Sequence, residues 1–136
     1  MNATLWLRIS SIVSLLFSIG HTLGGRKDWS PAGETDVLRA MRTVHYDAMG
    51  VSRTYLDFYR AFGFSLGVTM FLQTFVLWQL ASLARTQPVQ VRPIIAAFAL
   101  ATAAGGLLSL RFLFPVPAVF SFVLAACLGV AWWAAR

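Results

Sequence analysis

Charged residues are scarce in this chain, and their scarcity excludes a water-soluble protein. Of 136 residues, 11 are Lys or Arg and 5 are Asp or Glu, whereas 58% are hydrophobic. Soluble domains carry about a quarter charged residues, so this chain has too few to cover a water-exposed surface. The composition therefore excludes a secreted or cytosolic enzyme. It also excludes a nucleic-acid-binding domain, because the basic residues stand between apolar runs instead of forming a polar face.

Several residue types that site chemistry needs are missing or single. The one cysteine, Cys127, excludes an intrachain disulfide. His21, His45 and this distant cysteine do not supply the three or four ligands of a zinc site at suitable spacing. No carboxylate falls within an apolar run, which argues against a proton-coupled drug antiporter. We therefore expect no metal and no cofactor, with a haem between the two histidines as the alternative.

Four uncharged runs are long enough, or nearly so, to cross a bilayer, which takes roughly 17–25 residues. Backbone groups in hydrocarbon must be paired within their own segment, so each run is expected to be a helix. The sequence predicts an all-α integral membrane four-helix bundle, a single domain with crossings over 5–25, 58–84, 92–111 and 117–135. A cleaved signal peptide is the alternative for the first run, but no A-x-A-like site follows it.

A polar insert, residues 26–57, separates the first crossing from the second and contains all five acids. Apolar residues at helical spacing predict an amphipathic helix over 36–49, on the membrane interface or capping the bundle. Thr35 is a start signal for this helix, and Gly50 is expected to end it. Ser52 is expected to cap the helix that continues into the second crossing.

The insert side also collects the polar residues that could form a site. Two small-xxx-small patterns, Gly20–Gly24 and Gly63–Gly67, predict a close approach of the first two crossings there. His21 lies within the first pattern, and Asp57 and Arg60 belong to a helical stripe that runs into the second. Asp47 and His45 would point apart on a helix, so they are not expected to act as a dyad.

These positions predict one polar pocket. The candidate acid–base residues are His21, His45 and Asp57. The candidate ligand-binding residues are Asp47, Arg53, Tyr55, Tyr59, Arg60, Arg111 and Trp29.

Structural roles are the alternative for each of these residues. Arg53, Asp57 and Arg60 could form a salt-bridged helix start, and the tyrosines and Trp29 fit an interfacial aromatic belt. Arg111 could extend to the lipid headgroups. An ionisable residue between glycines inside a crossing favours function for His21, with a packed, hydrogen-bonded histidine as its alternative.

Two stretches carry a resemblance to a known family: G-H-T-L-G-G at Gly20–Gly25 and M-R-T-V-H-Y-D-A-M-G-V-S-R-T-Y-L-D-F-Y-R-A-F-G at Met41–Gly63. They resemble a family of small uncharacterised bacterial four-helix membrane proteins, over nearly the whole chain. The resemblance implies a fold and a site, but no reaction. The expected location is the bacterial inner membrane. A remoter architectural similarity to sterol-isomerase-like membrane bundles carries no matched motif.

The expected function is binding, or acting on, a small lipophilic molecule such as a terpenoid, sterol-like compound, quinone or lipid. Acid–base isomerisation or cyclisation is its sharpest form, and a non-enzymatic lipid- or quinone-binding protein or accessory subunit is the alternative. The expected partners are membrane lipids, the lipophile and a second copy through the Gly-xxx-Gly faces, without nucleic acid. Four crossings place both termini on one side, which we expect to be cytoplasmic although the insert side carries more bases.

Overall fold

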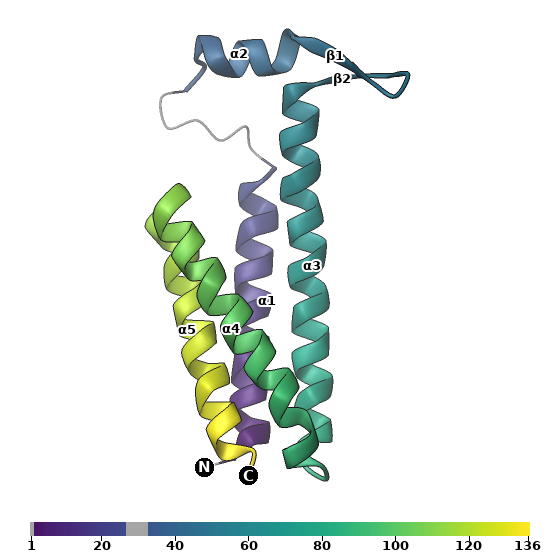
Figure 1. Ribbon diagram of the computed structural model, residues 1–136. Coiled ribbons are helices and arrows are strands. Elements are labelled where there is room, and N and C mark those ends of the chain that lie inside the picture. The colour runs from purple at the N-terminus through teal and green to yellow at the C-terminus, as the bar shows by residue number, and fades with distance from the viewer. Residues whose placement is uncertain (1, 27–32) are drawn as a thin grey trace. The chain divides into compact units, whose positions relative to one another are not determined.

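The computed structural model describes residues 2–26 and 33–136, and its elements are almost entirely helical. Figure 1 shows them in chain order: α1 (Ala3–Gly24), α2 (Asp36–Thr43), β1 (His45–Ala48), β2 (Val51–Thr54), α3 (Tyr55–Leu83), α4 (Pro88–Phe112) and α5 (Pro115–Ala134). Four of these, α1, α3, α4 and α5, are long and apolar enough to cross a membrane. The predicted all-α membrane fold is thereby confirmed.

The long helices begin earlier than the predicted crossings. Helix α3 begins at Tyr55 instead of residue 58, and α4 begins at Pro88 instead of residue 92. Helix α5 begins at Pro115, whereas the sequence suggested a turn continuing to Pro117. Proline fits the first helical turn because its missing N–H would have no partner there.

The chain divides into two compact units. The larger unit comprises Met1–Ser18 and Met70–Arg136, and the smaller unit comprises Ile19–Thr69. The larger unit thus contains most of α1, the second part of α3, and α4 and α5. The smaller unit contains the end of α1, the polar insert and the first part of α3.

The core of the larger unit is a continuous cluster of buried apolar side chains from all four long helices. Leu7 from α1, Leu77 from α3, Ile95 from α4 and Leu128 from α5 have no exposed surface. Many large apolar side chains on the outer faces of the same helices are exposed, Leu100 and Phe75 among them. Such extensive exposed apolar surface is typical of helices that face lipid.

A stripe of serines fixes α1 against α3 within the larger unit. Ser10, Ser11 and Ser14 are buried on α1. The Ser11 hydroxyl donates to the Thr74 carbonyl at 2.9 Å, and the Thr74 hydroxyl donates to Ser14 Oγ at 3.0 Å. Hydroxyl groups that bond across two membrane helices hold them together while keeping their polar atoms paired.

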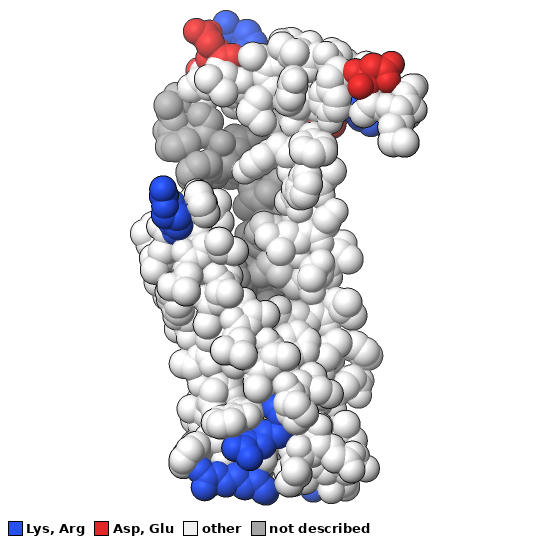
Figure 2. Space-filling model, viewed as in Figure 1, with Lys and Arg blue, Asp and Glu red and all other residues white. Residues whose placement is uncertain are grey.

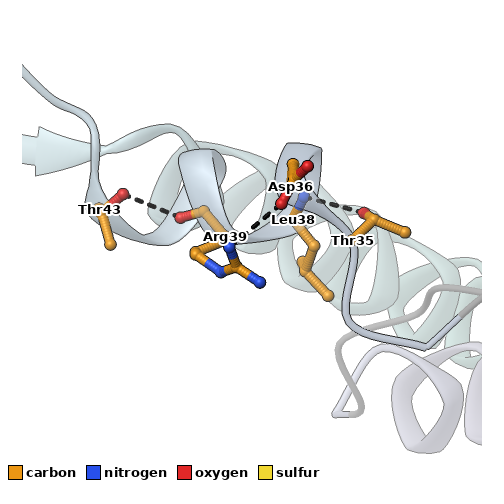
Figure 3. Close-up of polar contacts among 5 residues, drawn as sticks. All are labelled: Thr35, Asp36, Leu38, Arg39 and Thr43. Carbon is orange, nitrogen blue, oxygen red and sulfur yellow. Dashed lines mark hydrogen bonds and ion pairs between the residues drawn. The ribbon is translucent and has the colours of Figure 1, made fainter.

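In the smaller unit, α2 starts where the sequence predicted. Thr35 Oγ1 accepts the Leu38 N–H at 3.2 Å, which makes Thr35 the N-cap residue. An exposed ion pair of 3.1 Å joins Asp36 to Arg39, and the Thr43 hydroxyl donates to the Arg39 carbonyl (Figure 3). The start of the amphipathic helix is therefore confirmed.

The predicted extent of this helix, 36–49, is wrong. Helix α2 ends at Thr43, and the chain continues as an antiparallel hairpin of β1 and β2. Met49 and Gly50 form its two-residue turn with φ angles of 55° and 81°, the pattern of a type I′ turn. Asp47 Oδ1 accepts the Gly50 N–H at 2.9 Å and stabilises the turn. Local turn chemistry therefore prevails over the helical spacing of the apolar residues.

Helices α4 and α5 pack closely against each other in the larger unit (Figure 1). The contact includes Gly106, where a Cβ atom would lie 2.9 Å from Cε1 of Phe122. The neighbouring Gly105 has no atom within 4 Å of its Cβ position. The Phe122 ring thus occupies the space that a side chain at position 106 would need.

We expect Gly106→Ala to destabilise the protein by about 1–3 kcal/mol, because the added methyl group overlaps the Phe122 ring. Gly105→Ala is the matched control, and removing a flexible glycine from a helix should there stabilise by about 0.5–1 kcal/mol. Unfolding midpoints of both variants in the same detergent measure the difference. Equal midpoints would show that α4 and α5 do not pack through Gly106.

Candidate functional site

The central contact of the smaller unit joins His21 near the end of α1 to the backbone of α3. His21 Nε2 lies 2.8 Å from the Gly63 carbonyl oxygen. A carbonyl oxygen can only accept a hydrogen bond, so Nε2 carries the proton and donates. In the neutral imidazole this assigns Nδ1 as an acceptor. Nδ1 has no partner among the residues that the structure describes.

Thr22 lies beside His21 and faces the same part of α3. A Cβ atom at Gly67 would lie 3.0 Å from Thr22 Oγ1 and 3.7 Å from His21 Cδ2. Thr22 Oγ1 is buried and has no hydrogen-bond partner in the described chain. Glycine at position 67 thus lets the two helices approach closely.

The predicted close approach involves fewer of the glycines than the sequence suggested. Gly20, Gly24 and Gly63 have no described atom within 4 Å of their Cβ positions, so only one of the four pattern glycines makes a tight contact there. Tyr59 and Arg60 precede Gly63 by four and three residues, which places them on the same side of α3 as that glycine. Tyr59 is exposed.

His45 and Asp47 would point apart on a helix, but the structure places them on a strand of the hairpin. Residues two apart share one face of a strand, so His45 and Asp47 point to the same side of β1. In the antiparallel register they lie opposite Thr54 and Ser52. His45 Nδ1 lies 2.9 Å from the Thr43 carbonyl and donates to it, and the side chain is exposed.

Asp57 has a structural role at the start of α3. Its Oδ2 accepts the Thr54 N–H at 3.0 Å, and its own N–H donates to Thr54 Oγ1 at 3.1 Å. This reciprocal pair is a capping box in which aspartate takes the place of glutamate. Thr54, instead of the predicted Ser52, is therefore the residue that caps α3. Arg53 and Arg60 interact electrostatically with the same carboxylate.

Aromatic rings connect the hairpin to the first turns of α3. Tyr46 lies 5.1 Å from Tyr55 and 6.4 Å from Phe58 between ring centroids, and Phe58 lies 4.9 Å from Phe62. Tyr55, Phe58 and Phe62 remain exposed on their outer sides. Exposed aromatic rings at the start of a membrane helix are typical of the interface with the headgroups.

The remaining candidate residues lie apart from these contacts or outside the described chain. The Arg53 guanidinium donates to the adjacent Ser52 carbonyl at 2.9 Å. Arg111 belongs to the larger unit, with Cζ 5.2 Å from the Phe112 ring centroid. Trp29 lies outside the described residues. Within the described ranges, no group of three His, Cys, Asp or Glu side chains is arranged to hold a metal ion.

Sequence reasoning missed Thr22, Thr54 and the serines of α1. The signal for Thr54 was present, because T-x-x-D directly precedes an apolar run. The signal for the α1 stripe was also present, as Ser11, Ser14 and Ser18 recur at intervals of three and four residues. The helix assigned to 36–49 hid the capping box, because it moved the expected start of α3 to Ser52.

No protein-family model, no curated protein and no solved structure matches this chain. The family resemblance of the two motif stretches therefore stays a prediction.

We expect Thr54→Ala to loosen the first turn of α3, because the Asp57 N–H loses its acceptor. Loss of an N-cap costs about 0.5–2 kcal/mol, which corresponds to roughly 2- to 30-fold faster amide exchange in this turn. Hydrogen–deuterium exchange of peptides covering residues 52–60 measures it. Ser52→Ala is the control and should leave amide exchange unchanged. Faster exchange in Ser52→Ala but not in Thr54→Ala would show that Ser52 is the N-cap residue.

Proposed function

We propose that the protein is a multi-pass membrane protein that binds a small lipophilic molecule in the smaller unit. The observation that carries this proposal is the His21–Gly63 hydrogen bond of 2.8 Å. In this bond His21 Nε2 donates to the protein backbone, and Nδ1 remains available as an acceptor. An ionisable side chain in a membrane helix costs free energy, so its presence favours a functional role.

The free acceptor favours a ligand that carries a hydroxyl group. Such a ligand, for example a terpenoid alcohol, a sterol-like compound or a quinol, would donate its O–H to His21 Nδ1. The buried Thr22 hydroxyl beside it offers a second polar group without a described partner. The exposed aromatic side chains of α3, Tyr59 and Phe62 among them, offer apolar surface for the body of the ligand.

Binding explains the other candidate residues better than catalysis does. Asp57 is engaged in the capping box with Thr54, and Asp47 is engaged in the hairpin turn. A catalytic acid or base must reach the proton that it transfers. Both carboxylates already accept backbone N–H groups, which supports structural roles for them.

Acid–base isomerisation is the second candidate function, and one observation favours it. His45 and Asp47 share a face of the hairpin, and His45 lies opposite Thr54, the partner of Asp57. A lipophile whose reactive carbon reached this face could exchange a proton with His45. If so, membranes containing the His45→Ala variant should accumulate a chromatographically distinct isomer of the bound lipophile.

The binding proposal predicts that one lipophile co-purifies with gently extracted protein and is lost when His21 is changed. In His21→Gln the amide nitrogen can still donate to the Gly63 carbonyl, but no acceptor remains at the Nδ1 position. Loss of one hydrogen bond of about 1.4 kcal/mol should weaken binding about tenfold and so lower the occupancy of a site that is not saturated. Native mass spectrometry of the extracted protein measures the ratio of ligand to protein.

The matched control is His45→Ala, which removes the other histidine and should leave the ratio unchanged. An empty wild-type protein, or equal occupancy in His21→Gln and wild type, would contradict the proposal. Retention of the wild-type unfolding midpoint by His21→Gln separates loss of ligand from loss of fold.

A further inference from the structure

The larger unit carries arginines but no acidic residue. Met1–Ser18 and Met70–Arg136 contain no Asp or Glu. Their basic residues are Arg8, Arg85, Arg92, Arg111 and Arg136. The protein itself therefore supplies no carboxylate side chain in this unit to balance them.

All of these arginines except Arg111 belong to one end of the larger unit, the end that carries the chain termini. The buried core cluster brings together Ala3 from α1, Ala84 after α3, Val91 from α4 and Ala135 after α5. Each of the arginines at this end follows one of these core residues by one to five positions. Figure 2 shows basic side chains gathered there.

Tryptophan rings hold three of these guanidinium groups in place. Cζ of Arg8 lies 3.5 Å from the ring centroid of Trp78. The pairs Arg92–Trp132 and Arg136–Trp133 have distances of 4.3 Å and 3.6 Å. Tryptophan prefers the level of the lipid headgroups, where phosphates are the nearest anions.

Arg8 is fixed further by a hydrogen bond to α3. Its Nη2 donates to Ser82 Oγ at 3.0 Å, whereas its buried Nη1 has no partner among the described residues. A guanidinium has five N–H donors. Arg8 is therefore held firmly, and the N–H groups of this partly exposed side chain other than the buried Nη1 remain for an anion.

The Ser82 hydroxyl also lines an open groove of about 620 Å³ along α3. The groove is lined by the apolar side chains of Phe75, Val76, Leu80 and Leu83 and by the polar side chains of Gln79, Ser82 and Thr86. Arg85 comes between Ser82 and Thr86 in the sequence, and its backbone N–H donates to the Ser82 carbonyl at 3.3 Å. Neither Arg8 nor Arg85 lines the groove itself. Arg8 adjoins it through its hydrogen bond to Ser82, and Arg85 precedes the lining residue Thr86.

We infer that this groove binds an anionic phospholipid, with the phosphate at Arg8 and Arg85 and an acyl chain along Phe75 and Val76. Phe75 and Val76 come about two helical turns before Ser82 and Thr86, as an acyl chain lies deeper in a leaflet than its headgroup. The charge of the arginines matches a phosphate that has no competing carboxylate side chain in this unit. This site is separate from the proposed His21 site, since all of its residues belong to the larger unit.

The test is a titration of delipidated protein in zwitterionic detergent with three probes. These are phosphatidylglycerol, phosphatidylcholine of the same chain length, and inorganic phosphate. Binding is followed by native mass spectrometry and by the fluorescence of the tryptophans. We expect phosphatidylglycerol to bind at least about fivefold more tightly than phosphatidylcholine, and its affinity to fall as salt is added. Inorganic phosphate should not displace it.

Two variants assign the site. Arg8→Gln and Arg85→Gln should each weaken phosphatidylglycerol binding about fivefold, as expected for one arginine near an anionic surface. Arg111→Gln, at the far end of α4, removes the same charge and should leave the affinity unchanged. If Arg8→Gln fails to fold, the phosphatidylglycerol affinity of Arg85→Gln, which lies in the exposed turn, alone decides whether the site exists.

Equal affinity for the two phospholipids would overturn the inference, as would an unchanged affinity in the deciding arginine variants. A loss in Arg111→Gln equal to that in Arg85→Gln would show a general charge effect instead of a site. Displacement by inorganic phosphate would show a free-anion site instead of a lipid site.

Discussion

The structure depends on one constraint, which is that backbone polar groups in an apolar helix must be paired within that helix. A carbonyl oxygen that already accepts its helical N–H has a second lone pair that can accept another hydrogen bond. Two side chains of α1 donate to such carbonyl oxygens of α3. Ser11 donates to the Thr74 carbonyl in the larger unit, and His21 donates to the Gly63 carbonyl in the smaller unit. Each bond needs the two backbones to be close, which explains glycine at position 67.

The same constraint accounts for where the charges lie. Acidic residues occur only in the insert and the first turn of α3, and those that the structure describes accept backbone N–H groups or pair with arginines. Three arginines of the larger unit have tryptophan rings as partners, and one of them, Arg8, also bonds to a serine hydroxyl. Charge is thus kept at positions where the backbone or an aromatic ring can stabilise it, and His21 near the end of α1 is held by its bond to the Gly63 carbonyl.

The sequence predicted the long helices well, because long apolar runs and proline positions carry strong signals. It located His21 and the glycine patterns, but it could not say which glycine makes the contact, since that depends on the rotation of each helix. It failed in the insert. Residues 44–54 fit helical spacing, yet the Met49-Gly50 turn and the Asp47 side chain favour a hairpin. That error separated His45 from Asp47 and moved the cap of α3 from Thr54 to Ser52.

The central claim is that His21 binds the Gly63 carbonyl through Nε2 and keeps Nδ1 as an acceptor. Nitrogen-15 NMR of histidine-labelled protein in bilayers, at alkaline pH where imidazoles are neutral, tests it most directly. We expect two opposite tautomers: His21 protonated on Nε2, and His45 protonated on Nδ1 through its bond to the Thr43 carbonyl. The His21→Gln variant assigns the signals. A His21 ring protonated on Nδ1, or one that exchanges between tautomers, would contradict the account.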